Sequence, residues 1–74
     1  MRITGELLKA ERINQNLSIK DVAQALKLTV KVITAIESGQ MDELPAKTFV
    51  RGFVRAYAEL LKLDSQVVLR QFLE

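Results

Sequence analysis

Residues that cap helix ends recur at close intervals in the first half of the chain, and they constrain the fold more than any other feature. Ser18 stands three positions before Asp21, a capping-box variant in which Asp replaces Glu or Gln. Thr29 is a second N-cap residue, and Gly39 stands where a helix C-terminus favours glycine. Two short capped helices joined by about three residues predict a helix-turn-helix unit over about residues 18–38.

The apolar residues of this segment stand where the packing of such a unit requires them. Ala23 is small enough for the crossing of two helices, and Leu28 provides an apolar side chain at the turn. Ile33 and Ile36 form an inward pair on the second helix. The other inward positions are Val22, Leu26 and Val32. Two unrelated helices of a generic bundle are the alternative, and the caps, the turn and the small residue together favour the helix-turn-helix.

A helix is also expected before this unit, over about residues 4–15. Thr4 is its expected N-cap, and Glu6 in the first turn suits the helix dipole. Its expected apolar face consists of Leu7, Leu8, Ala10 and Ile13. Asn16 and the two residues before it are expected to end the helix, because Asn tolerates the left-handed conformation of a C-cap.

Two helices are expected after the unit. One spans about residues 45–62, with Pro45 at the first helical position, and the other spans about 64–73, with Asp64 as its N-cap. The last helix carries the apolar residues Val67, Val68, Leu69 and Phe72. No stretch alternates with period two for long enough to predict a strand. The sequence therefore predicts one all-α domain over residues 1–74, with a five-helix, repressor-like helix-turn-helix fold.

The composition argues against an enzyme. The chain contains neither Cys nor His, which excludes disulfides, the usual zinc sites and a Ser-His or Cys-His nucleophile. Asp42 and Glu43 are adjacent on an expected connector, which suits solvation better than acid-base chemistry. The serines at positions 18, 38 and 65 suit caps and turns. We therefore expect no catalysis, no cofactor and no metal, and no run of apolar residues is long enough to predict a transmembrane helix.

The outward positions of the second helix in the unit would face a DNA groove. They are Val30, Lys31, Thr34 and Ala35. Only Lys31 among them has the polar reach that base recognition needs. Lys20, Lys27 and Lys31 are candidate phosphate contacts, whereas Asp21 and Glu37 are expected to reduce the positive potential of a chain whose net charge is only +2. Sequence-specific DNA binding through Lys20, Lys27, Lys31 and Thr34 is therefore the alternative function.

The helix expected over residues 45–62 carries two apolar stripes rather than one. The first stripe consists of Val50, Val54, Tyr57 and Leu61. The second, about 100° away around the helix, consists of Phe49, Phe53, Ala56 and Leu60. The polar side consists of Lys47, Arg51, Arg55, Glu59 and Lys62. Either the last helix covers the second stripe, or Phe49 and Phe53 are exposed anchors for a partner, rimmed by Arg51 and Arg55. Gly52, inside the helix, permits another backbone to approach closely, either from this chain or from a partner.

These residues together resemble the N-terminal cytoplasmic domain of the RodZ family of bacterial cell-shape proteins. The resemblance extends from Gly5 to Phe72 and includes Gly5-Glu6-Leu7-Leu8, Leu17-Ser18-Ile19, Ile36-Glu37-Ser38-Gly39 and Leu44-Pro45-Ala46. Its most specific part is the run Phe49-Val50-Arg51-Gly52-Phe53-Val54-Arg55-Ala56-Tyr57-Ala58. The helix-turn-helix part alone would match many repressor-like proteins.

The resemblance implies a partner, MreB, the bacterial homologue of actin. In this family two aromatic residues one turn apart on the fourth helix are central to that contact, and by position they are Phe49 and Phe53, with Arg51, Arg55, Ala56 and Leu60 around them. Many members have Tyr at one or both positions, so a contact through a phenol hydroxyl is missing here. The resemblance also implies a longer protein with one transmembrane helix, whose helix-turn-helix domain lies at the cytoplasmic face of the bacterial inner membrane. The chain is then expected to be an excised domain, or else a truncated natural homologue.

Overall fold

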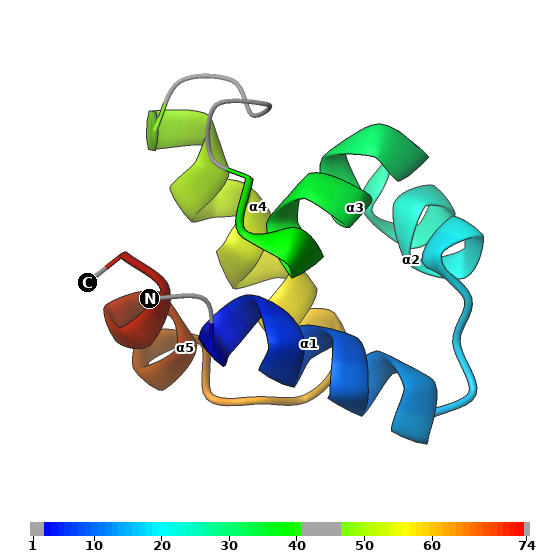
Figure 1. Ribbon diagram of the computed structural model, residues 1–74, viewed down its shortest axis with the longest axis horizontal. Coiled ribbons are helices and arrows are strands. Elements are labelled where there is room, and N and C mark those ends of the chain that lie inside the picture. The colour runs from blue at the N-terminus through cyan, green and yellow to red at the C-terminus, as the bar shows by residue number, and fades with distance from the viewer. Residues whose placement is uncertain (1–2, 41–46, 74) are drawn as a thin grey trace.

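The described part of the protein, residues 3–40 and 47–73 of a computed structural model, consists of five helices and no strand (Figure 1). In chain order they are α1 (Ile3–Asn14), α2 (Ile19–Leu26), α3 (Val30–Ser38), α4 (Lys47–Leu60) and α5 (Ser65–Leu73). Figure 1 shows α2 and α3 at the upper right, α1 along the lower edge, α5 at the lower left, and α4 running from the upper left towards the centre of the molecule. The all-α, five-helix prediction is therefore confirmed.

The local signals of the helix-turn-helix unit form as the sequence predicts. The Ser18 hydroxyl accepts a hydrogen bond from the Asp21 N–H, and the Asp21 carboxylate accepts one from the Ser18 N–H, both at 2.9 Å. Thr29 caps α3 through a 3.2 Å bond from the Val32 N–H to its hydroxyl. Lys27 ends α2 in the left-handed conformation (φ 59°), and Gly39 ends α3 in the same way (φ 72°).

The core lies where the inner faces of all five helices meet. It is formed by Leu8, Val22, Ala23, Ile33, Ile36, Val50, Val54, Tyr57, Ala58, Leu61 and Val68. The first stripe of the fourth helix is thus entirely buried. Leu26, Leu28 and Val32 pack against this core from partly buried positions, as expected for the helix-turn-helix unit.

The prediction for α1 is wrong in two respects. The helix begins at Ile3, so Thr4 lies within it and is not its N-cap. Leu7 and Ile13 are 43% and 55% exposed, and Ala10 is exposed as well. The buried face instead consists of Gly5, Leu8 and Arg12. Apolar content misidentified this face because the helix buries a glycine for close packing and an arginine for an ion pair.

Gly5 allows α1 to lie directly against the end of α3. A Cβ atom built on Gly5 would stand 2.6 Å from the carbonyl oxygen of Ile36 and 2.7 Å from that of Glu37. Both distances are too short for real contacts, and both obstacles are backbone atoms that cannot rotate away. Glycine at this position therefore sets how closely the two helices approach.

Of the two C-terminal helices, α5 spans the residues expected of it, whereas α4 ends slightly earlier than expected. Helix α4 ends at Leu60, and Lys62 adopts the left-handed conformation (φ 64°) in the connector. Pro45, together with Asp42 and Glu43, lies outside the described residues. The carboxylate of Asp64 accepts a 3.0 Å hydrogen bond from the Gln66 N–H, as expected of the N-cap of α5. Within the described part of the chain, no helix has the length and apolar character needed to cross a membrane.

Candidate protein-binding site

The second stripe of α4 is exposed at its first residue and partly buried at the other three. Phe49, in the first turn, is 60% exposed, the largest value among the exposed large apolar side chains of the described residues. Phe53, Ala56 and Leu60 are each partly buried, and Phe53 and Leu60 touch the core from outside. The last helix therefore does not cover the whole stripe, and its N-terminal end faces solvent.

The two phenylalanine rings form one continuous surface. Their centroids lie 6.4 Å apart, and the ring planes are inclined by only 18°. This offset stacking is favourable in itself and fixes both rings in one orientation. Because Phe53 is anchored against the core, the pair presents Phe49 on a rigid base. A prepositioned aromatic surface loses little conformational entropy on binding.

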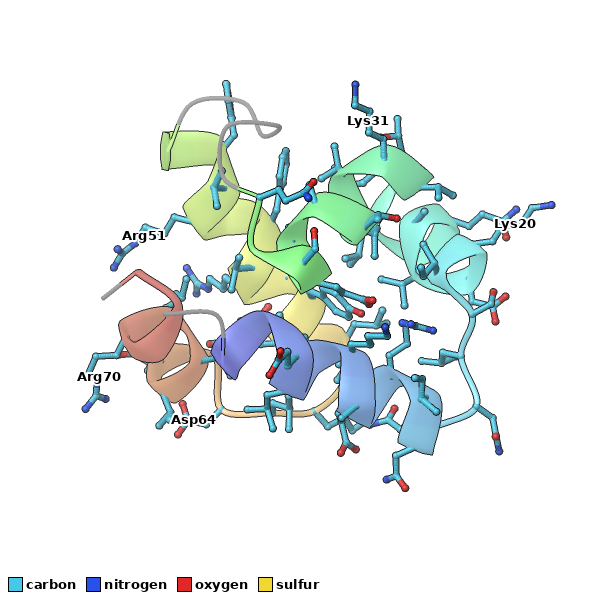
Figure 2. The ribbon with its side chains drawn as sticks, viewed as in Figure 1. Lys20, Lys31, Arg51, Asp64 and Arg70 are labelled. Carbon is cyan, nitrogen blue, oxygen red and sulfur yellow. The ribbon has the colours of Figure 1, made fainter. Side chains whose placement is uncertain are left out.

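The two arginines predicted to surround this surface are both exposed. Figure 2 shows Arg51 extending outward from α4. Arg55 lies one turn further along and forms an exposed ion pair with Glu59, with Nε 3.3 Å from Oε2. Such exposed pairs contribute little to stability. The guanidinium of Arg55 is therefore accessible to an acidic partner at small energetic cost.

On the helix-turn-helix unit, the predicted DNA contacts are only partly brought together. Lys20, Lys27, Lys31 and Thr34 are all exposed, and Figure 2 shows Lys20 and Lys31 projecting from α2 and α3. Ala35, predicted to face outward, is instead only 3% exposed, so it offers no surface to a DNA groove. Helical position alone had placed Ala35 outward, but the packing of α3 within the domain buries it.

The expectation for Glu37 is also wrong. Its carboxylate was expected to weaken the positive surface of the unit, but it is 6% exposed and is paired with Arg12. Arg12 Nε donates to Glu37 Oε2 at 2.7 Å, and Arg12 Nη2 donates to Oε1 at 3.2 Å. The buried pair neutralises itself, so among the described acidic residues of the unit only Asp21 remains at the surface.

Tyr57 completes this buried polar cluster, which the sequence analysis missed. Its hydroxyl donates to Glu37 Oε2, and Arg12 also donates from Nη1 to the Leu17 carbonyl oxygen at 2.8 Å. Burial, reinforced by the hydrogen bond to Glu37, raises the pKa of Tyr57. The same carboxylate, through its hydrogen bond, raises the pKa of Arg12. The sequence did contain a signal for this cluster. Arg12 follows the apolar Leu8 by one helical turn, and Glu37 follows Ile33 in the same way, so two opposite charges lie on apolar helix faces.

The described residues include no group of three or more acidic side chains that could hold a metal ion. The cluster of Arg12, Glu37 and Tyr57 is closed to solvent and internally satisfied, so its role is to join α1, α3 and α4. The accessible features are the stacked phenylalanines of α4 and the lysines of α2 and α3.

The fold and these surfaces define a helix-turn-helix domain. A family described as a helix-turn-helix domain matches residues 7–68, and the chain belongs to that family. More particularly, the chain is homologous to the N-terminal region of RodZ. It is 35% identical to "Cytoskeleton protein RodZ" of Streptococcus pneumoniae over 65 residues, covering 88% of this chain and 24% of that protein.

Two other relatives have less informative names. An "Uncharacterized membrane protein YmfM" of Bacillus subtilis is 39% identical over 49 residues, covering 66% of this chain and 17% of that protein. An uncharacterized protein of Haemophilus influenzae is 33% identical over 64 residues, covering 85% of this chain and 21% of that protein. The chain thus spans about a quarter or less of the length of these relatives. No solved structure matches the chain significantly.

Proposed function

We propose that this domain is a non-catalytic adaptor that docks the actin-like protein MreB through the outer face of α4. The observation that carries the proposal is the 60% exposure of Phe49, stacked on the partly buried Phe53. The homology to RodZ, which is named as a cytoskeleton protein, supports a partner of the same class. Ala56 and Leu60 continue the contact along the helix, and Arg51 and Arg55 form its rim.

The physical basis is that of an interface hot spot. Large aromatic side chains and arginines are enriched where most of the binding energy resides, because they bury much area at small entropic cost. Nothing in the packing of the domain itself accounts for the exposure of the Phe49 ring to water. Binding to a filament would bury this ring and so account for its position at the surface.

The proposal extends to the longer protein of which such a domain is part. The named relatives are several times longer than this chain, and one is described as a membrane protein. We propose that the domain lies at the cytoplasmic face of the bacterial inner membrane and connects MreB filaments to it in cell-shape maintenance. Any membrane attachment would use segments other than these residues.

Co-sedimentation of the purified domain with MreB filaments tests the proposal. Phe49→Ala is the sharpest variant, because the exposed ring contributes little to folding, and it is expected to reduce binding at least about tenfold. Ile13→Ala is the matched control, since Ile13 is 55% exposed but lies on α1. Phe53→Ala is less decisive because Phe53 also packs against the core. Wild-type binding by folded Phe49→Ala would contradict the proposal.

DNA binding is the second candidate, and the burial of Glu37 favours it. With Glu37 buried and paired with Arg12, Asp21 is the one exposed acidic residue of the described helix-turn-helix unit, which also carries Lys20, Lys27 and Lys31 at its surface. Binding of this kind would decrease steeply with salt and with the charge reversal Lys31→Glu. A gel shift of random duplexes at low salt measures it. No shift at tens of micromolar protein, roughly the upper end of nonspecific affinities, would exclude this candidate.

A further inference from the structure

The three glycines of the chain occupy three different environments, and two of them are explained by the domain itself. Gly39 has a φ of 72°, a conformation that other residues rarely adopt. Gly5 lies so close to α3 that a Cβ atom would collide with backbone oxygens. In both places the fold requires glycine.

Neither a positive φ nor a close backbone contact explains the glycine at position 52. It lies inside α4, is exposed, and does not have a positive φ. A Cβ atom built on it would meet nothing within 4 Å. Glycine in an exposed helix interior is less stable than alanine, because it loses more backbone freedom on folding. The domain therefore retains a destabilising residue that its own packing does not use.

The position of Gly52 on α4 connects it to the exposed aromatic surface. The residues three or four positions away from it along the helix are Thr48, Phe49, Arg55 and Ala56. Gly52 and Ala56 together make a low strip of helix between the Phe49 ring and the Arg55–Glu59 pair. Gly52 contributes no side chain to this strip, and Ala56 contributes only a methyl group.

We propose that Gly52 is a specificity-determining contact residue, at which MreB places a segment of its main chain directly against the backbone of α4, beside Phe49. This inference rests on the proposed docking of MreB to α4 and adds a steric requirement to it. Phe49 contributes apolar area, and Gly52 allows the approach that brings the partner alongside that ring. Any side chain at position 52 separates the two backbones and shifts the partner away from Phe49.

A graded series at position 52 separates binding from stability. Gly52→Ala is expected to raise Tm by about 2–8 °C, because alanine is the better helix former, while weakening MreB binding about tenfold. Gly52→Leu keeps good helix propensity but adds a larger side chain, so it is expected to weaken binding further. Thermal unfolding by circular dichroism and the affinity for polymerised MreB are measured on the same samples.

Two further variants distinguish the possible results. Asn14→Ala, an exposed substitution on α1, tests whether a helix-favouring change alone alters binding and is expected to bind as wild type. If both Gly52 variants also bind as wild type while Phe49→Ala does not, the contact at Gly52 is disproved and the docking face stands. If Phe49→Ala binds as wild type too, the docking of MreB to α4 fails, and this inference fails with it.

Discussion

Arg12 and Glu37 form a buried ion pair across the interface of α1 and α3, with Arg12 Nε 2.7 Å from Glu37 Oε2. The two residues are separated by 25 positions and are only 7% and 6% exposed. Both carboxylate oxygens accept hydrogen bonds, and the hydroxyl of Tyr57 adds a connection to α4. The pair thus joins three helices of a small domain that has no disulfide.

Replacing one member of this pair is expected to lower the stability of the domain far more than replacing both. Arg12→Met or Glu37→Met alone leaves a buried charge without its partner, which costs about 3–5 kcal/mol. The double variant leaves no buried charge and is expected to recover most of that loss. Urea unfolding of the four proteins measures the coupling as a double-mutant cycle. Additive effects of the two single substitutions would contradict a coupled pair.

Tyr57 is expected to make the domain sensitive to alkaline pH. Burial raises its pKa in the folded state, so the neutral phenol stabilises the fold fully below the unfolded value of 10.0. This contribution decreases as the pH rises above that value towards the folded pKa, because the unfolded chain releases the proton first. Since Tyr57 is the only tyrosine and the chain has no tryptophan, absorbance near 295 nm reports its ionisation alone.

The tyrosinate signal and the loss of helical circular dichroism are expected to appear together, above the pH at which free tyrosine ionises. Tyr57→Phe removes the titrating group but also the hydrogen bond to Glu37. It is therefore expected to be less stable at neutral pH, with a stability that varies less between pH 9 and 11, the range around the unfolded pKa. Ionisation at the free-tyrosine pH with retained helical signal would contradict the burial of this hydroxyl.

Alanine at the two helical glycines is expected to have opposite effects on stability. At Gly5 the added Cβ would lie 2.6 Å from the Ile36 carbonyl oxygen, so α1 and α3 must separate, at a cost of about 1–3 kcal/mol. At Gly52 the added Cβ meets nothing, and better helix propensity stabilises the domain by about 0.5–1 kcal/mol. Thermal unfolding compares the two variants, and equal effects at both positions would contradict the close contact at Gly5.

The capping box of α2 is expected to stabilise the fold at neutral pH and to stabilise it less in acid. Ser18→Ala removes the bond to the Asp21 N–H and costs about 1 kcal/mol. The hydrogen bond from the Ser18 N–H lowers the pKa of the Asp21 carboxyl. The ionised carboxylate therefore stabilises the fold above the unfolded value of 3.8, and this contribution is lost as the pH decreases below it.

Melting curves of wild type and Asp21→Ala, recorded from neutral pH to well below the unfolded value of 3.8, test this dependence. The difference in Tm between the two proteins is expected to decrease in acid. A difference that is the same at both ends of this pH range would show that the carboxylate charge is irrelevant to the cap. Thr29→Ala serves as the comparison, because the hydroxyl that caps α3 does not titrate in this range.

Much of the candidate site could be predicted from the sequence, because α4 is a regular helix in which apolar and polar residues recur with helical periodicity. The spacing of Val50, Val54 and Tyr57 identified its buried side, which the structure confirms. The same spacing left the state of Phe49 and Phe53 undecided. Their exposure depends on where α5 lies against α4, and no local pattern specifies that position.

The sequence by itself determined the helix-turn-helix unit, because Ser18, Asp21, Thr29 and Gly39 act on backbone groups only three or four positions away. Only the tertiary structure decided which face of α1 is buried and whether Glu37 is a surface charge. Those outcomes depend on Arg12 meeting Glu37 across 25 positions and on Gly5 touching α3. The periodicity of one helix does not specify which residue of another helix it will meet, so these pairings become visible only when the helices are packed together.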